Sequence, residues 1–315
     1  MIQGLVITPP ILGRISIGRV VERNGKRLPE KDDQFTLTSQ IQTPEGWLPH
    51  PLDEILRKAA PNGKLRSLPI SLLFSDPDLN FRAEYTLFDR TTGRPTCAGD
   101  GIKCRRHTNE GMANLPCPSP QLCELGSGGR CKAFGRLNVR IGDDDELGTF
   151  IFRTTGYNSI RALMARLAYF EAVSGGLLAC MPLELRLRGK STTQSHRTPI
   201  YYVDITVREG MTLEEALAQA KATDQHRRET GFDQQALDAA ARQGFGNGIF
   251  EESESESTEV IEEFYPEPDA ITDADSEGGV LKSSDTNQAP VGSEPSTLAG
   301  KLDAKLSAGK EPSAN

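Results

Sequence analysis

Five of the six cysteines lie within residues 97–131, whose sequence reads CAGDGIKCRRHTNEGMANLPCPSPQLCELGSGGRC. This stretch is rich in glycine and proline and has almost no apolar periodicity, so burial alone is not expected to hold it in one shape. Four cysteine thiolates around a zinc ion would supply the missing cross-link. Disulfides are a weaker hypothesis, because nothing in the sequence indicates an oxidising compartment, and unpaired thiols are the third.

The expected zinc ligands are Cys97, Cys117, Cys123 and Cys131. The last three fall within fifteen residues, and the first directly follows a predicted strand and a Gly-Arg-Pro turn. The five cysteines are separated by six, twelve, five and seven residues, which is not the C-x-x-C spacing of common zinc ribbons. Cys104 and His107 therefore stay as substitute ligands, although an exposed loop position is favoured for His107. Four closed ligands leave no open coordination position, so the predicted site is structural.

Other stretches with chemically suggestive residues are better explained as turns. Gly99-Asp100-Gly101 is too short to specify a phosphate or metal site. Residues 142–146, GDDDE, offer ligands for a hard cation such as magnesium, but glycine and aspartate are also typical of a strand-to-strand turn, which is favoured. The four histidines, His50 and His196 among them, are scattered and select no Ser-His-Asp arrangement. We expect no enzyme, no catalytic residue and no small-molecule substrate.

The predicted elements place the cysteine segment between two strands of a sheet. Residues 81–88 alternate cleanly and lead into it, and residues 135–141 follow it with Leu137, Val139 and Ile141 on one face. The segment 97–131 is therefore predicted to be a zinc-stapled loop inserted between strands.

The rest of the body reads as strands with a few helices. Asn24-Gly25 is a strong hairpin signal after a strand at 11–22, and the return strand is expected to be interrupted at Pro29 and residues 30–33. Along residues 183–188 the leucines are expected to face inward and Glu184, Arg186 and Arg188 outward. Further strands are predicted at 35–38, 68–74, 149–157, 181–191 and 199–207, and helices at 52–60, 160–173, 211–222 and 233–243. The fold class is α+β, with a strand-dominated body.

A composition shift divides the chain into a body at residues 1–245 and a tail at residues 246–315. The tail carries 16 acidic and four basic side chains, a net charge of −12, so the body carries +4 of the total of −8. The tail is rich in serine, glutamate, proline and alanine and is predicted to be a disordered acidic segment. Residues 260–266, VIEEFYP, are an acidic-hydrophobic patch that could dock on a partner, with an ordinary linker as the favoured alternative.

Basic side chains of the body are candidates for contact with nucleic acid or a protein partner. They are Arg105, Arg106, Arg136, Arg140, Arg153, Arg161, Arg186, Arg188, Lys190 and Arg197. Solvated strand faces are an equally good explanation, because a charge of +4 is modest. No segment approaches the ~20 apolar residues of a membrane helix, so we expect no membrane contact and a cytoplasmic location.

Four segments resemble the recombination directionality factor-like family of phages and integrative conjugative elements. They are GLVITPPILGRISIGRVVERNGKRLPEKDDQF, DRTTGRPTCAGDG, LPCPSPQLCELGSGGRCKAFGRLNV and FRTTGYNSIRAL, and the resemblance extends over about residues 3–210. Members of this family are often labelled only as hydrolase or metal-binding proteins. The resemblance implies a zinc-bound structural site, held here by Cys97, Cys117, Cys123 and Cys131. It also implies binding to a large serine integrase on DNA, which switches that enzyme from integration to excision.

We therefore expect a non-catalytic, zinc-binding accessory factor of mobile-element DNA recombination that binds a site-specific serine integrase. The alternative is a DNA-binding accessory protein of recombination or replication, whose DNA affinity would be salt-sensitive and would strengthen when residues 250–315 are removed. A metal-dependent hydrolase is the second alternative, and it requires an open metal position.

Overall fold

The computed structural model describes residues 7, 10–23, 26–43, 46–142, 148–191, 199–245, 260–261 and 264–265, and the side chains of residues 19–31 are not part of that description. Every described residue belongs to one unit of the chain, residues 1–279. Arg197, His196, residues 143–147 and nearly all of the predicted acidic tail lie outside the described residues.

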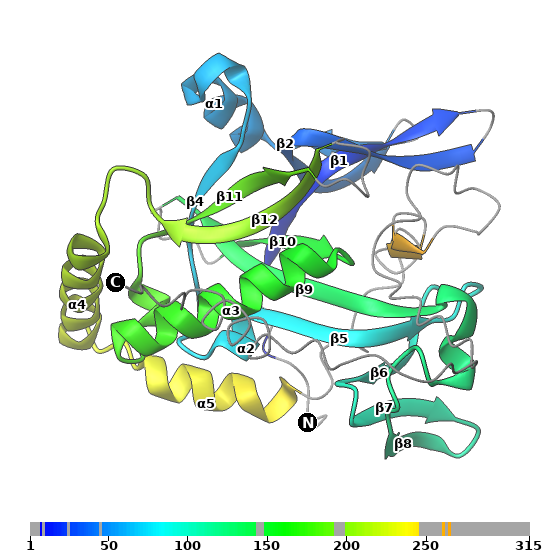
Figure 1. The fold of residues 1–315 in the computed structure, drawn as a ribbon. Helices are drawn as coiled ribbons and strands as arrows, with labels where there is room; N and C mark the ends of the chain where they lie inside the picture. The colour runs from blue at the N-terminus through cyan, green and yellow to red at the C-terminus, as the bar shows by residue number, and fades with distance from the viewer. Residues whose placement is uncertain are drawn as a thin grey trace, which may run out of the picture. The chain divides into compact units, whose positions relative to one another are not determined.

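Twelve strands form the described sheet (Figure 1). The strands are β1 (Ile11–Arg23), β2 (Lys26–Thr43), β3 (Gly46–Pro49), β4 (Ser67–Ser71), β5 (Phe81–Phe88), β6 (Pro95–Gly99), β7 (Lys103–Thr108), β8 (Gly111–Pro116), β9 (Cys131–Ile141), β10 (Thr149–Thr154), β11 (Leu183–Lys190) and β12 (Ile200–Val207). The main path runs β3-β2-β1-β10-β9-β5-β6-β7-β8, and β4, β11 and β12 branch from β9 through β4. Only β1 and β10 pair in parallel among these strands.

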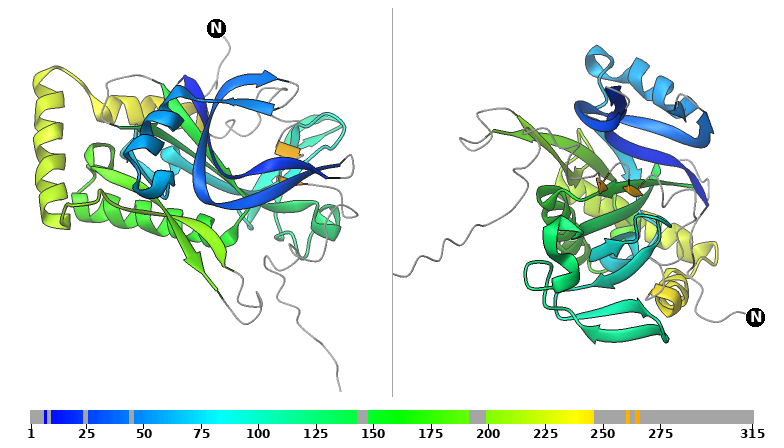
Figure 2. Two further views of the ribbon diagram at one scale, coloured as in Figure 1. Left: turned by 90° about the horizontal axis from the view of Figure 1, so that it is seen from above. Right: turned by 90° about the vertical axis from the view of Figure 1, so that its right-hand side faces the viewer.

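β1 and β2 form the predicted hairpin, whose turn residues Asn24 and Gly25 lie outside the described residues, but the predicted interruption of the return strand is wrong. Arg23 pairs with Lys26, so the two strands are joined by the two residues of the hairpin signal, and Figure 2 shows a long, curved two-stranded ribbon. The return strand is continuous, with Val20 paired to Pro29. Since β3 pairs only with the other end of β2, Pro29 lies where β2 is an edge within the described sheet, a position at which strands tolerate proline.

The segment at residues 97–131 is not the long irregular loop that was predicted. It contains the strands β6, β7 and β8 as an antiparallel meander, followed by the 3₁₀ helix η2 (Glu124–Gly129) and the start of β9. β8 is exposed along Met112, Asn114 and Pro116 and only partly buried at Ala113 and Leu115, and the outer part of β7 is exposed. Neither strand therefore has the alternation of apolar and polar residues that predicts a strand.

Five α-helices pack around the sheet in the described residues. The helices are α1 (Pro51–Ala59), α2 (Pro77–Asn80), α3 (Tyr157–Ser174), α4 (Leu213–Glu229) and α5 (Gln234–Gly244), with short 3₁₀ turns η1 (Pro61–Gly63) and η3 (Leu178–Cys180). A capping box begins α4, because Thr212 and Glu215 hydrogen-bond each other's backbone N–H. No described helix is both long enough and apolar enough to cross a lipid bilayer.

The main core lies between the sheet, its β4–β11–β12 branch and α3. Gly135 on β9 allows α3 to approach, because an added Cβ there would lie 3.3 Å from a side-chain carbon of Ile160 and closer still to Phe81. Leu183, Leu185 and Leu187 face this core as predicted. The prediction that Glu184 faces solvent is wrong. Its side chain is buried, with 3% of the residue exposed, and accepts hydrogen bonds from the Glu209 backbone N–H and the Thr206 hydroxyl. The structure is thus α+β, with strands dominating.

Candidate functional site

The register of the sheet places three predicted site residues in one row. Leu87 on β5 pairs with Cys131 on β9 on one side and with Cys97 on β6 on the other, and Cys97 pairs in turn with Arg106 on β7. Paired residues of neighbouring strands point to the same face of a sheet. Cys131, Cys97 and Arg106 therefore share the face that also bears the main core, at the end of the sheet formed by β6, β7 and β8.

Cys104, which the sequence suggested as the spare cysteine, lies on the same face next to this row. It pairs with Gly99, two residues from Cys97, and its thiol is in hydrogen-bond contact with that of Cys97. The strands approach so closely here that a Cβ on Gly99 would lie 2.6 Å from the Cys104 Cβ. The Cys104 Sγ lies 3.7 Å from the Pro116 carbonyl oxygen, next to Cys117.

The remaining two cysteines approach from the segment after β8. The Cys117 backbone N–H donates to the Ile102 carbonyl at 2.8 Å, which holds Cys117 beside the start of β7. Cys123 precedes η2, which folds back so that Gly126 is buried against the Cys131 side chain. Cys117 and Cys123 both interact electrostatically with Cys131. The tertiary structure thus gathers all five clustered cysteines, while Cys180 lies elsewhere, beside Arg227.

A cation already lies among these thiols. The Arg106 Nε is 3.5 Å from the Cys97 Sγ, and its terminal nitrogen is 4.0 Å from the Cys104 Sγ. Burial raises the pKa of Cys104 to about 11 and that of Cys131 to about 12, so both are neutral thiols at pH 7 unless a bound cation favours the thiolate.

The thiols of this cluster are suitable ligands for zinc, but their side chains do not stand in the positions of a complete metal site. Across the described ranges, no three His, Cys, Asp or Glu side chains are placed so that they could hold a metal ion as they stand. Four cysteines close to one another in this cluster match the ligand number of a structural zinc site. His107 is not brought to the thiols, because it follows Arg106 on β7, faces the other side of the sheet and is exposed.

The Gly99-Asp100-Gly101 segment is the β6–β7 turn. The Asp100 carboxylate accepts hydrogen bonds from the backbone N–H groups of Lys103 and Ile102, both at 2.8 Å, and these bonds lower the pKa of Asp100. This is an Asx-type turn, in which the carboxylate serves the backbone of its own hairpin, and it accounts for the glycine and aspartate without a ligand.

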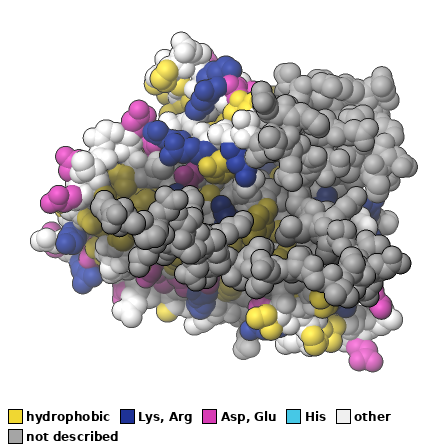
Figure 3. Space-filling model, in the orientation of Figure 1, with side chains coloured by type: hydrophobic (Ala, Val, Ile, Leu, Met, Phe, Trp, Pro, Cys, Tyr) yellow, Lys and Arg dark blue, Asp and Glu magenta, His cyan; other side chains and the backbone are white. Residues whose placement is uncertain are grey.

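The basic residues predicted for β11 are largely neutralised by acidic neighbours. Arg186 pairs with the buried Glu184 at 2.5 Å and with Glu209 at 3.3 Å, and Arg188 lies 3.6 Å from Asp204. Lys190 donates to the Asn158 side-chain oxygen at 2.8 Å, next to the start of α3. Arg161 is exposed on α3. On the described part of the face in Figure 3, basic and acidic side chains are interspersed rather than gathered into one cationic surface.

The other predicted arginines lie on the sheet face opposite α3. Arg153 on β10 pairs with Arg136 on β9, which pairs with Arg82 on β5, and the alternation of the strands adds Arg140 and Arg14 to the same face. Arg14 stacks on Trp47, with its guanidinium carbon 3.8 Å from the ring centre, and Arg82 pairs with Glu84 at 2.6 Å. Arg105 belongs to this face as well, because it pairs with Ala98. Sequence reasoning missed Arg14 and Arg82, although strand alternation would have identified them.

Comparison with known proteins gives one match. A family model described as Gp3-like, recombination directionality factor-like, matches residues 12–208. The matched residues include every strand from β2 to β12 and all five clustered cysteines. No curated protein and no solved structure matches the chain.

Proposed function

The chain belongs to the recombination directionality factor-like family, and from this we propose that it is a non-catalytic accessory factor that binds a serine integrase and favours excision over integration. The observation that carries the proposal is the family match over residues 12–208, which spans the whole cysteine-bearing part of the sheet. The pairing of Arg186 and Arg188 with acidic groups supports contact with a protein rather than with bare DNA phosphates.

Reconstituted recombination tests this proposal. The full chain is added to the serine integrase of the same mobile element, together with DNA that carries either the two original attachment sites or the two hybrid sites formed by integration. We expect a stable complex of the two proteins on gel filtration, excision only when the chain is present, and reduced integration. An integrase whose product ratio is unchanged by a stoichiometric excess of the chain, with no complex formed, would contradict the proposal.

The second part of the proposal is that four cysteine thiolates of the cluster hold a zinc ion. Cys97, Cys117, Cys123 and Cys131 are the proposed ligands, and Cys104 lies close enough to replace one of them. When bound, zinc would act as a structural cross-link between β6, β9 and the segment after β8. Support comes from the convergence of five cysteines that lie up to 34 residues apart in a region with few apolar residues of its own.

Elemental analysis of protein purified under reducing conditions tests the zinc proposal. We expect about one zinc per chain, as in structural four-thiolate sites. Cys117→Ser should lose most of this zinc and melt at a lower temperature, whereas Cys180→Ser, which removes a buried cysteine outside the cluster, should retain it. Cys104→Ser distinguishes the ligand set, because it should retain zinc if the four proposed cysteines are the ligands. The proposed zinc cross-link would be contradicted by wild-type protein that contains no metal and melts at the same temperature as Cys117→Ser.

A further inference from the structure

A second hydrophobic cluster covers the sheet on the side opposite the cysteines. The sheet contributes Phe88, Ala98 and Phe134, and the segment at residues 260–265 contributes Val260 and Tyr265, with Ile261 and Phe264 partly buried beside them. Val260 is 1% exposed and Tyr265 is 4% exposed. This segment, orange in Figure 1, was predicted to be a linker, yet its described residues lie in contact with β5, β6 and β9.

The contacts have the pattern of one turn of an amphipathic helix. The Tyr265 backbone N–H donates to the Ile261 carbonyl at 2.9 Å, and the four apolar residues occupy positions i, i+1, i+4 and i+5. The Tyr265 ring lies 5.0 Å from that of Phe88, and the Phe264 ring lies 5.8 Å from that of Phe134. The Tyr265 hydroxyl donates to the buried Thr86 carbonyl at 3.3 Å.

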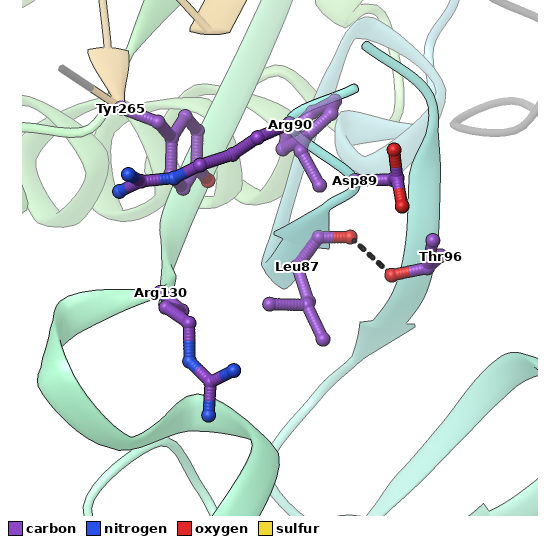
Figure 4. A pocket seen from close by; sticks show the side chains of 7 residues that line it. Leu87, Asp89, Arg90, Thr96, Arg130 and Tyr265 are labelled. Carbon is purple, nitrogen blue, oxygen red and sulfur yellow. Dashed lines mark hydrogen bonds between the residues drawn. The ribbon is translucent and has the colours of Figure 1, made fainter. Parts of the chain in front are cut away.

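Three basic side chains and Asp89 lie around the rim of this surface, and the sequence of its occupant is acidic. Lys132 donates from Nζ to the Phe264 carbonyl at 3.4 Å and lies 5.4 Å from the Tyr265 ring centre. Arg90 and Arg130 line a cavity of about 290 Å³ that opens beside Tyr265, and Figure 4 shows the Arg90 side chain extended alongside the tyrosine ring. The sequence of the segment places Glu262 and Glu263 between its two apolar pairs. The surface therefore suits a short helix that is apolar on one side and acidic on the other.

The surface and its occupant differ in their relation to the family. Phe88, Ala98 and Phe134 fall within the matched residues 12–208, whereas the segment at 260–265 lies more than 50 residues beyond them. The apolar surface therefore lies inside the residues that the family model matches, and the segment that covers it lies outside them. A surface that buries two aromatic rings of this segment has the chemistry to bind a similar segment from another protein.

We propose that the Phe88–Ala98–Phe134 surface is a peptide-binding site for an acidic amphipathic helix of the recombinase partner, and that residues 260–265 occupy it in the absence of that partner. The identity of the partner rests on the proposed function, but the peptide site does not. The cavity between Arg90 and Arg130, which opens beside Tyr265, gives a partner helix room for additional contacts. Binding of the recombinase would then require displacement of residues 260–265, which lowers its apparent affinity for the free chain.

A labelled peptide of residues 257–268, STEVIEEFYPEP, tests the site directly by fluorescence anisotropy. Full-length protein with Val260→Ala and Tyr265→Ala should bind it at least tenfold more tightly than the wild type, whose site is filled. Arg90→Glu in that background should weaken binding several-fold, while Arg161→Glu, a charge reversal on exposed α3, should not. A peptide with serine at positions 260 and 265 should not bind. We call the protein with Val260→Ala and Tyr265→Ala the released variant. The proposal would be overturned if the peptide bound equally to the wild type and the released variant, or if it bound to neither.

A second measurement covers the case in which the double variant does not fold. A protease site inserted after Gly248 in the full chain allows the protein to fold before the segment is cut from the body. The cleaved fragment should dissociate on gel filtration or be displaced by a tenfold excess of the synthetic peptide. A fragment that neither dissociates nor exchanges would identify residues 260–265 as a permanent part of the core.

Integrase binding separates this inference from the proposed function. Tighter integrase binding by the released variant than by the wild type supports both. If the integrase binds equally to the wild type and the released variant, the proposed function stands, but the proposal that residues 260–265 must be displaced is wrong. Absence of integrase binding to either protein, together with normal peptide binding, overturns the proposed function and the named partner but leaves the peptide site.

Discussion

Gly99 determines how closely β6 and β7 can approach at the centre of the cysteine cluster. Its lack of a side chain brings Cys104 against the β6 backbone, with the Cys104 Cβ 2.6 Å from where a Gly99 Cβ would lie. The adjacent Cys97 and Cys104 then share one face with Arg106. Two thiols and one guanidinium are thus held together next to a glycine, which has no side chain.

Gly99→Val should therefore destabilise the protein by about 1–3 kcal/mol, because the added side chain must push β7 away from β6. Chemical denaturation measures this, and any bound zinc should be lost with it. Gly189→Ala is the matched control, because its added Cβ meets only the movable ring of Tyr201 at 3.3 Å, and it should change stability by less than about 0.5 kcal/mol. Equal stability of both variants would mean that the β6–β7 contact is not tight.

Single elements are attached to this sheet by a few buried polar groups. Helix α1 is the clearest case, because the buried Asp53 accepts the Leu37 backbone N–H of β2 at 2.8 Å and pairs with Arg57 at 2.6 Å. Arg57 in turn donates to the Phe35 carbonyl at 2.8 Å. The helix is thus bonded to the backbone of β2 at two points, through one ion pair.

Asp53→Ala should cost about 3–5 kcal/mol, because it leaves the buried Leu37 N–H without its acceptor and the partly buried Arg57 guanidinium without its counter-ion. Glu54→Ala on the same helix removes an i,i+4 pair with Lys58 whose side chains are 73–75% exposed, and it should cost at most about 0.5 kcal/mol. Urea unfolding of the two variants gives the comparison. Similar midpoints for both would show that α1 does not depend on Asp53 for its attachment.

At the scale of the whole molecule, charge is separated between the family-matched body and the residues after it. Residues 1–245 carry a net charge of +4, and residues 246–315 carry −12. A polyanion attached to a weakly basic body competes with DNA for the same cations. The full chain is therefore expected to bind duplex DNA weakly.

Removal of residues 266–315 keeps Tyr265 in place and changes the net charge from −8 to −3, so it alters charge without releasing the apolar segment. We expect the full chain to show no saturable binding to non-specific duplex DNA at micromolar concentration and physiological salt. The shortened chain should bind more tightly only at low salt, and a full-length variant with serine at the nine acidic positions beyond residue 265 should behave likewise. Submicromolar binding by the wild type would favour the DNA-binding alternative.

Several elements and the fold class could be predicted because they depend on local patterns. Alternating leucines at 183–187, the hairpin signal at residues 24–25 and the capping box at Thr212 each act within a few residues, and the structure has the corresponding strand, hairpin register and helix start. The unusual density of cysteines at 97–131 likewise indicated a common site before any geometry was known.

What only the tertiary structure decided depends on pairing between distant strands. The position of Cys104 among the other thiols, and of His107 away from them, follows from the β6–β7 register, which short polar strands do not reveal in sequence. Glu184 can be buried because its carboxylate accepts hydrogen bonds from the Thr206 hydroxyl and the Glu209 backbone N–H, which lie more than 20 residues away in the sequence. Tyr265 reaches Thr86 across 179 residues, and its burial depends on an apolar surface assembled from three strands, which no local pattern around residue 265 contains.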